Sequence, residues 1–199
     1  MEEWNRRAFL LVDAPVDAPS WLVVVATVLA QDAIFAIPVG LAATWLWGRH
    51  GNRGGLLLAF IAGEIALGLN QIAGLVVDHT RPFAVPVGRT LIEHVADNSF
   101  PSDHGSFMAA VGICLVLWVR PVFLGGGVLA LAAVVAWSRL YLGIHFPLDM
   151  AGSLISAAIA TVMVVPMRGW VASRLLPRHL DPLYGMVFSR LVRRGWVRP

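Results

Sequence analysis

The hydrophobic and polar positions of this 199-residue chain fall in long blocks and do not alternate residue by residue. Apolar blocks cover residues 21–47, 56–77, 104–119, 123–140 and 148–167. A helix needs about 20 mostly apolar residues to cross the hydrocarbon core of a bilayer, with a lower limit near 17. The third and fourth blocks lie close to that limit. The pattern predicts an all-α, polytopic membrane bundle of about five transmembrane helices.

The two ends of the chain mix apolar with charged positions. We expect one membrane-embedded domain over residues 1–199, with an interfacial N-terminal segment (1–18), a helical core (19–167) and a basic tail (168–199). Pro177 and Pro182 predict that the tail is divided into short pieces, and Pro38 predicts a kink in the first span. The tail suits an anchor on anionic lipid. It equally suits a solvated segment, and the sequence leaves both open.

The composition narrows the class of protein. Hydrophobic residues make up 58% of the chain and charged residues 14%, against about 25% charged in a typical soluble domain. The mean hydropathy is +0.73. These values argue against a soluble enzyme, a nucleic-acid-binding module and a disordered chain. The single cysteine, Cys114, allows no intramolecular disulfide and argues against a metal–cysteine site.

The basic residues indicate how the bundle lies in the membrane. All 15 lysine-plus-arginine positions are arginine. Five spans would place ten of them on one side and five on the other. The positive-inside rule assigns the ten-arginine side, with the C-terminus, to the cytoplasm. The N-terminus and the loops over residues 78–102 and 140–147 then face outward.

Three polar clusters fall in the outward loops and the helix ends beside them. Their sequences are DHTRPF (78–83), SFPSDHG (99–105) and, over residues 138–149, SRLYLGIHFPLD. Polar groups at membrane depth are costly, so their positions carry information. The predicted topology puts all three clusters on the same face of the membrane, which favours a single site.

The residue types in these clusters suit phosphoryl chemistry. Asp149 lies four residues after His145, close enough to bond one imidazole nitrogen and leave the other as a base or nucleophile. Two arginines, Arg81 and Arg139, offer forked donors to a tetrahedral oxyanion. Ser102 and the helix end that follows it add further donors. His104 is a second histidine, able to protonate a leaving oxygen.

Each of these features also has a simpler interpretation. A lone His-x-x-x-Asp pair is more often a structural hydrogen bond. Arg-Pro commonly ends a helix, and the second copy at Arg120-Pro121 is interpreted in that way. Ser102 or Asp103 would make an ordinary helix N-cap. The combination of all three clusters on one face is what points to a site.

In their order and spacing, the clusters resemble the three-part signature of the type 2 phosphatidic acid phosphatase superfamily. SRLYLGIHFPLD matches the third part without a gap, and FPSDHGS (100–106) matches the second, with Asp103 where the common form has glycine. DNSFPSDHGS together with HTRPF looks most like the bacterial undecaprenyl-diphosphate phosphatase branch. The resemblance covers roughly residues 56–167.

The resemblance implies a role for each matching residue. His145 would be the nucleophile that forms a phosphohistidine, Asp149 would orient it, and His104 would be the general acid. Arg81, Ser102 and Arg139 would bind the phosphate oxygens. The family uses no metal, and no cofactor is expected.

The implied substrate is undecaprenyl diphosphate, hydrolysed to undecaprenyl phosphate at the outer face of the bacterial inner membrane, which recycles the cell-wall lipid carrier. The expected partners are this lipid and the bilayer, without nucleic acid. The sequence does not indicate the oligomeric state.

One position departs from the signature. The family has a lysine seven residues before the Arg-Pro arginine, and this chain has Gly74 there. His79 and Arg89 are the candidates to replace it, because they are close in sequence.

Alternative functions remain open at this stage. The same site would suit a glycerophospholipid phosphatase or a lipid phosphotransferase. A metal-dependent hydrolase would use Asp149 with four histidines: His79, His94, His104 and His145. A non-enzymatic transporter would line a path with the polar residues inside the spans: Asp32, Glu64, Asn70 and Gln71.

Overall fold

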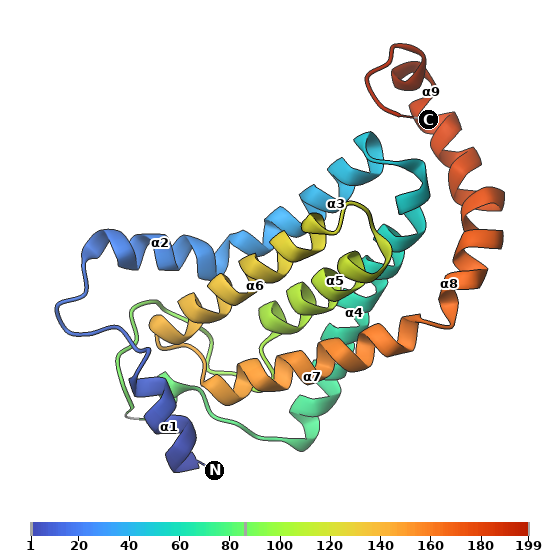
Figure 1. Ribbon diagram of the computed structural model, residues 1–199. Helices are drawn as coiled ribbons and strands as arrows, with labels where there is room; N and C mark the ends of the chain where they lie inside the picture. Colours follow the sequence, from blue (N-terminus) through green and yellow to red (C-terminus); the bar gives the residue numbers. More distant parts are fainter. Residues whose placement is uncertain (1, 86, 199) are drawn as a thin grey trace.

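The computed structural model describes residues 2–85 and 87–198, and every secondary-structure element in those ranges is helical (Figure 1). The all-α bundle predicted from the sequence is therefore confirmed. Its centre is formed by four helices: α4 (Arg53–Val76), α5 (Asp103–Trp118), α6 (Phe123–Tyr141) and α7 (Pro147–Val164). Helix α5 packs against the other three, so the first residues of α5 lie among the ends of its neighbours.

Small residues allow the central helices to approach closely. A Cβ atom at Gly63 of α4 would lie 2.6 Å from the ring of Phe107 on α5. A Cβ atom at Gly125 of α6 would lie 2.9 Å from the carbonyl oxygen of Gly112 on α5. Helices in a bilayer associate through such close packing, because the lipid tails remove the hydrophobic drive between them.

The helix lengths support three or four of the five expected membrane spans. Among the described residues, three helical stretches are long and apolar enough to cross a membrane: His50–Val76, which includes the short helix η2 (His50–Asn52), Phe123–Tyr141 and Pro147–Val164. A bent pair, Ser20–Gln31 with Ala33–Trp47, makes a fourth if it forms one span. The remaining expected span, α5, has only 16 residues. It begins at the capping residue Ser102 and ends before Arg120-Pro121, which confirms that this Arg-Pro pair lies at a helix stop.

The first span bends just before Pro38. Helix α2 (Ser20–Gln31) ends before Asp32, and the short helix η1 (Ala33–Phe35) leads into α3 (Ala36–Trp47) at an angle of 44°. Pro38 is the third residue of α3, where backbone N–H groups have no partner within the helix. The predicted kink in the first span is therefore confirmed, and it includes Ile34, the residue four positions before Pro38 whose carbonyl oxygen a proline cannot bond.

The N-terminal segment packs against the bundle. Helix α1 (Glu2–Leu10) contacts α7, and the ring of Phe9 meets that of Phe146 edge-on at 5.2 Å. The Asn5 side-chain oxygen accepts a hydrogen bond from the Leu148 amide at 3.0 Å. Phe9 is fully buried by these contacts. Helix α1 consequently covers the turn that precedes α7.

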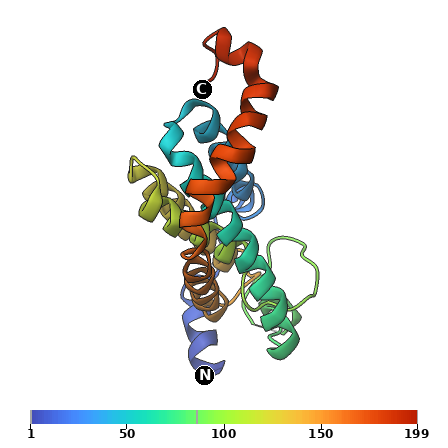
Figure 2. The ribbon, with the colours of Figure 1, turned by 90° about the vertical axis from the view of Figure 1, so that its right-hand side faces the viewer.

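The C-terminal segment is more continuous than its prolines suggested. Helix α8 (Met167–Trp170), the π-helical segment η4 (Val171–Leu180) and α9 (Asp181–Arg193) follow one another without a break. Pro177 lies inside η4 and Pro182 in the first turn of α9. The prediction that these prolines separate the tail into short pieces is therefore wrong. Figure 2 shows this segment rising past the end of the bundle that lies away from the N-terminus.

The close α5–α6 contact gives a testable prediction about stability. Gly125→Ala places a methyl group against the Val116 amide and the Gly112 carbonyl, so we expect it to destabilise the protein by about 1–3 kcal/mol. Gly126→Ala is the matched control, because a Cβ atom there meets nothing within 4 Å. Thermal unfolding in detergent, followed by tryptophan fluorescence, measures the difference. Equal midpoints for the two variants would contradict this packing.

Candidate active site

A polar cavity of about 360 Å³ lies where α4 and α6 end and α5 begins. The side chains that line it include those of Asn70, Arg81, His94, His104, Arg139 and His145. The three polar clusters of the sequence, separated by up to 70 residues, therefore meet at one end of the bundle. Four of the six predicted site residues line this cavity, and Asp149 lies directly behind His145.

The imidazole of His145 is held between a carboxylate and two guanidinium groups. Its Nδ1 lies 3.1 Å from Asp149 Oδ2. Its Nε2 lies 3.2 Å from Arg81 Nη1 and 3.1 Å from Arg139 Nη2. Arginine only donates and an ionised carboxylate only accepts, so the ring hydrogen is on Nδ1 and the lone pair is on Nε2. We predicted that Asp149 bonds one imidazole nitrogen and that the other stays available as a base or nucleophile. In the structure the bonded nitrogen is Nδ1, and Nε2 carries the lone pair.

Asp149 is fully buried and accepts four contacts from different parts of the chain. Oδ2 receives the Phe146 amide at 2.8 Å, the Ser99 hydroxyl at 2.5 Å and the His145 contact described above. Oδ1 lies 2.7 Å from His79 Nδ1. Asp149 is the third residue of α7, and its bond to the Phe146 amide caps the start of that helix. The helix begins at Pro147, one residue before the apolar block of the sequence.

Both arginines are held in place by backbone carbonyl groups. Arg139, in the last turn of α6, donates from Nη1 to Ala30 O at 2.8 Å. Arg81, which follows α4, donates to Ile144 O at 2.9 Å, and its Nε bonds Asp97 at 2.7 Å. Both arginine residues are about 95% buried. Fixed guanidinium groups of this kind form a preorganised site for an oxyanion.

The first residues of α5 divide between the cavity and the fold. His104 lines the cavity, as does Asp103, whose carboxylate accepts from the Asn70 side chain at 2.8 Å. Ser102 is fully buried and forms the N-cap of α5, with its hydroxyl oxygen 3.5 Å from the Gly105 amide. Ser102 is not among the residues that line the cavity. Its capping interpretation is confirmed, while its phosphate contact stays a prediction.

Burial and charge set the protonation of the groups around the cavity. Burial lowers the pKa of His145 to about 4, the bond to Asp149 opposes this, and the charges of Arg139 and Arg81 lower it further. His145 is therefore neutral near pH 7. Burial also lowers the pKa of His94. Partial burial acts to raise the pKa of Asp97, but the bond to Arg81, the charge of that guanidinium and smaller contributions together bring the pKa below its usual value.

The side of the polar cavity that includes Gly74 is lined by amide and imidazole groups. Gly74 lines the cavity together with Asn70, Gln71, His94 and Asn98. The Asn98 amide donates to Gly74 O at 3.1 Å, which joins the loop before α5 to the end of α4. Neither candidate for replacing the family lysine lies there. His79 contacts Asp149, and the Arg89 guanidinium donates to the carbonyl of Pro15.

Comparison with known proteins identifies the family. The model of the PAP2 superfamily matches residues 54–171, more than half of the chain. The chain belongs to the PAP2 superfamily. YbjG of Escherichia coli (strain K12) is 34% identical over 198 residues, covering 100% of this chain and 99% of YbjG.

A second curated relative and a solved structure are also similar to this chain. The undecaprenyl-diphosphatase BcrC of Bacillus subtilis (strain 168) is 36% identical over 131 residues, covering 66% of this chain and 67% of BcrC. The crystal structure of Aquifex aeolicus LpxE has the same fold, with a TM-score of 0.66 at 18% identity over 82% of this chain and 95% of LpxE. The region that the PAP2 model matches, residues 54–171, includes every residue of the polar cavity named above.

The four polar residues that a transporter would use lie in different places in this fold. Asn70 is buried against Asp103 and Ser106, and Gln71 lines the cavity. Asp32 and Glu64 are exposed on the outside of the bundle. In the described ranges, no group of three or more histidine, cysteine or acidic side chains is arranged to hold a metal ion.

Several residues that build the site are not among the six predicted site residues, and His79 has a different place from the two considered for it. Ser99 and His79 hold Asp149, while Asp97 and Asn98 hold Arg81 and the side of the polar cavity that includes Gly74. All four lie in loops, where no helical period relates them to the residues they contact. Their only signal was proximity to the signature motifs.

The surroundings of His145 predict opposite effects of two substitutions on its pKa. Arg139→Gln removes a positive charge, so we expect the pKa to rise above about 4. Asp149→Asn removes the carboxylate that favours the protonated ring, so we expect it to fall. Nitrogen NMR of protein labelled at histidine, recorded as a function of pH, follows the titration. Shifts of the same sign in both variants would contradict this description.

Proposed function

We propose that this lipid phosphatase of the PAP2 superfamily hydrolyses undecaprenyl diphosphate to undecaprenyl phosphate and inorganic phosphate. The observation that carries the proposal is the position of His145 Nε2 between two guanidinium groups, with Nδ1 on a buried carboxylate. The name of BcrC, 36% identical, supports the choice of substrate. The reaction recycles the lipid that carries cell-wall precursors.

The first step transfers the terminal phosphoryl group to the enzyme. Phosphate oxygens bind Arg81 and Arg139, which places phosphorus in front of Nε2. The lone pair of Nε2 forms the N–P bond while the bond from phosphorus to the bridging oxygen breaks. The two guanidinium groups stabilise the charge on the equatorial oxygens, which is the main source of catalysis in phosphoryl transfer. Ser102 is the third predicted phosphate ligand, and it would contribute from the first turn of α5.

Asp149 and His104 have complementary roles in this mechanism. Asp149 accepts the Nδ1 hydrogen of His145, which keeps the lone pair on Nε2 and stabilises the positive charge that the ring acquires. His104 lines the same cavity and donates a proton to the departing bridging oxygen. A water molecule then attacks phosphorus, His104 takes its proton, and the N–P bond breaks to regenerate neutral His145.

The shape of the cavity supports a diphosphate as substrate. With about 360 Å³, the cavity extends from His145 to the wall formed by α4. Gly74 contributes no side chain to this wall, and Asn70 and His94 line it with polar groups. The terminal phosphoryl group on the two arginines then leaves room for the second phosphate beside these polar groups.

We also propose that the cavity opens on the outer side of a bacterial inner membrane. Ten arginines belong to the end of the bundle away from the cavity or to the tail beyond it, and five belong to the cavity end. The positive-inside rule then places the C-terminus in the cytoplasm. The headgroup of the lipid reaches the cavity while its isoprenoid chain stays in the bilayer.

Purified protein tests the reaction directly. We expect release of inorganic phosphate from undecaprenyl diphosphate in detergent, and a loss of at least about 10³-fold in kcat in His145→Ala, which removes the nucleophile. Unchanged unfolding of that variant is the control for folding. Activity that survives in His145→Ala would contradict the mechanism. A preference for phosphatidic acid or phosphatidylglycerol phosphate would contradict the substrate.

The role proposed for His104 predicts a dependence on the leaving group. A lipid monophosphate leaves as a weaker base than an alcohol, so it needs less help from a general acid. We therefore expect His104→Asn to lose more of its kcat with phosphatidic acid than with undecaprenyl diphosphate. The comparison requires both substrates to be measured with both forms of the enzyme. Equal losses would remove His104 from the role of general acid.

A further inference from the structure

A second group of polar side chains lies at the end of the bundle opposite the catalytic cavity. There α3 and α5 end, α4 and α6 begin, and a cavity of about 600 Å³ opens between them. Three of the residues that line it are arginines, namely Arg49, Arg120 and Arg198. Among the described residues that line it, none is acidic. Three positive charges around one cavity form a site for an anion.

Hydrogen bonds fix the backbone on which these arginines stand. Asn52 bonds both the amide and the carbonyl group of Arg120, at 3.1 and 2.6 Å. The Arg198 amide donates to Leu46 O at 2.9 Å, and its carbonyl oxygen accepts from the Tyr184 hydroxyl at 2.6 Å. The C-terminal segment thus folds back onto α3 and brings Arg198 to the cavity.

The nearby acidic residue is already engaged. Asp181 at the start of α9 lies 3.4 Å from Arg53 and 3.2 Å from His50. Arg53 is almost fully buried, and its guanidinium lies 4.0 Å from the centre of the Tyr184 ring. Asp181 therefore compensates the buried Arg53, and it does not line the cavity of Arg49, Arg120 and Arg198.

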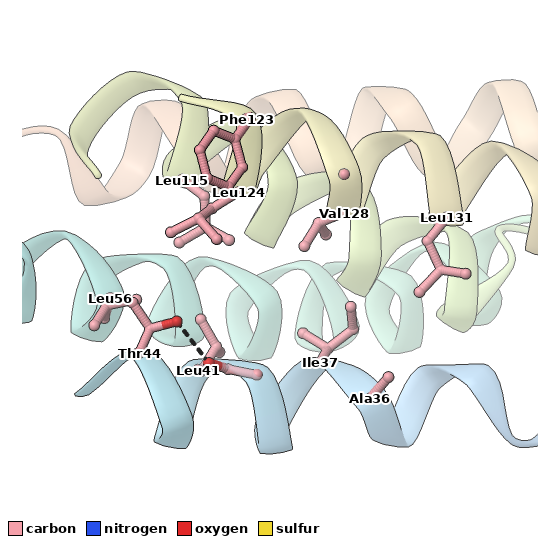
Figure 3. A pocket seen from close by; sticks show the side chains of 12 residues that line it. Ala36, Ile37, Leu41, Thr44, Leu56, Leu115, Phe123, Leu124, Val128 and Leu131 are labelled. Atoms are coloured by element: carbon pink, nitrogen blue, oxygen red, sulfur yellow. Dashed lines mark hydrogen bonds between the residues drawn. The ribbon is translucent and has the colours of Figure 1, made fainter. Parts of the chain in front are cut away.

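An apolar cavity adjoins the basic one. It has a volume of about 260 Å³ and lies between α3 and α6, with α4 and α5 behind (Figure 3). Thr44 and Leu124 line both cavities, so the two are neighbours along the same groove. Ile37, Leu41 and Val128 point into the apolar part in Figure 3. A basic mouth joined to an apolar slot matches a molecule with an anionic head and a hydrocarbon chain.

We propose that this groove binds an anionic phospholipid, with its phosphate on the three arginines and an acyl chain in the apolar cavity. Guanidinium groups form strong charge-assisted hydrogen bonds with phosphate oxygens. The adjoining cavity favours a lipid over a soluble anion, because a free phosphate would leave it unused. The site is separated from His145 by the length of the bundle, and it does not depend on the proposed reaction.

The basic half of the site is tested with charge-matched variants. One carries Arg49→Gln, Arg120→Gln and Arg198→Gln. The control carries Arg174→Gln, Arg178→Gln and Arg193→Gln, exposed tail positions that line neither cavity. Each variant is purified with phosphatidylcholine and titrated with phosphatidylglycerol, and unfolding temperatures give the affinity. We expect the first variant to bind phosphatidylglycerol at least about tenfold more weakly than wild type, and the control to bind it like wild type.

The apolar half is tested with two neighbouring glycines. Gly127 lines the apolar cavity, and a Cβ atom there meets nothing within 4 Å, so Gly127→Leu adds its side chain to the space of the cavity. Gly126 also has open space around it, but it does not line the cavity. We expect Gly127→Leu to weaken the binding of phosphatidylglycerol and Gly126→Leu to leave it unchanged.

Each outcome decides the proposal. Equal binding by the two triple variants would overturn the arginine site, and equal binding by the two glycine variants would overturn the acyl-chain site. Inorganic phosphate is titrated in parallel. If phosphate alone reproduces the difference between wild type and the Arg49, Arg120 and Arg198 variant, the groove is a soluble-anion site and the lipid assignment falls.

Discussion

The buried carboxylate of Asp149 is the constraint on which the site depends. An ionised carboxylate cannot remain among apolar helices unless its oxygens are bonded. Its partners come from three connecting segments: the loop after α4, the loop before α5, and the turn between α6 and α7, which supplies both the Phe146 amide and His145. One side chain thereby fixes the positions of three connecting segments.

The arginines complete this arrangement from the other side of the imidazole. Asp149 holds one nitrogen of His145, and Arg81 and Arg139 face the other. The two guanidinium groups repel one another, and each is held by a backbone carbonyl group in the absence of any bound anion. The free energy needed to bring two positive charges together is thus spent during folding, so it does not oppose binding of a phosphate.

The sequence predicted the bundle and the candidate site residues for different reasons. Apolar blocks predicted the helices because the length of a span is set by the bilayer, whereas the short helix η1 at the bend of the first span has no signal of its own in the apolar pattern. The signature motifs located His145 and Asp149, because their spacing is local. His79 and Ser99 could not be predicted in the same way. Each meets Asp149 across 50 residues or more, a distance set by the whole fold.

The short central helix has a mechanical consequence. With 16 residues, α5 is about 24 Å long, less than a hydrocarbon core of about 30 Å. Its two ends, one at the polar cavity beside His145 and one beside the basic groove, therefore cannot both reach the aqueous boundary of an undeformed membrane. The bilayer must thin around the bundle, or one end must lie below the surface. The thickness of the membrane thus sets how far below its surface a lipid headgroup must lie in order to contact the ends of α5.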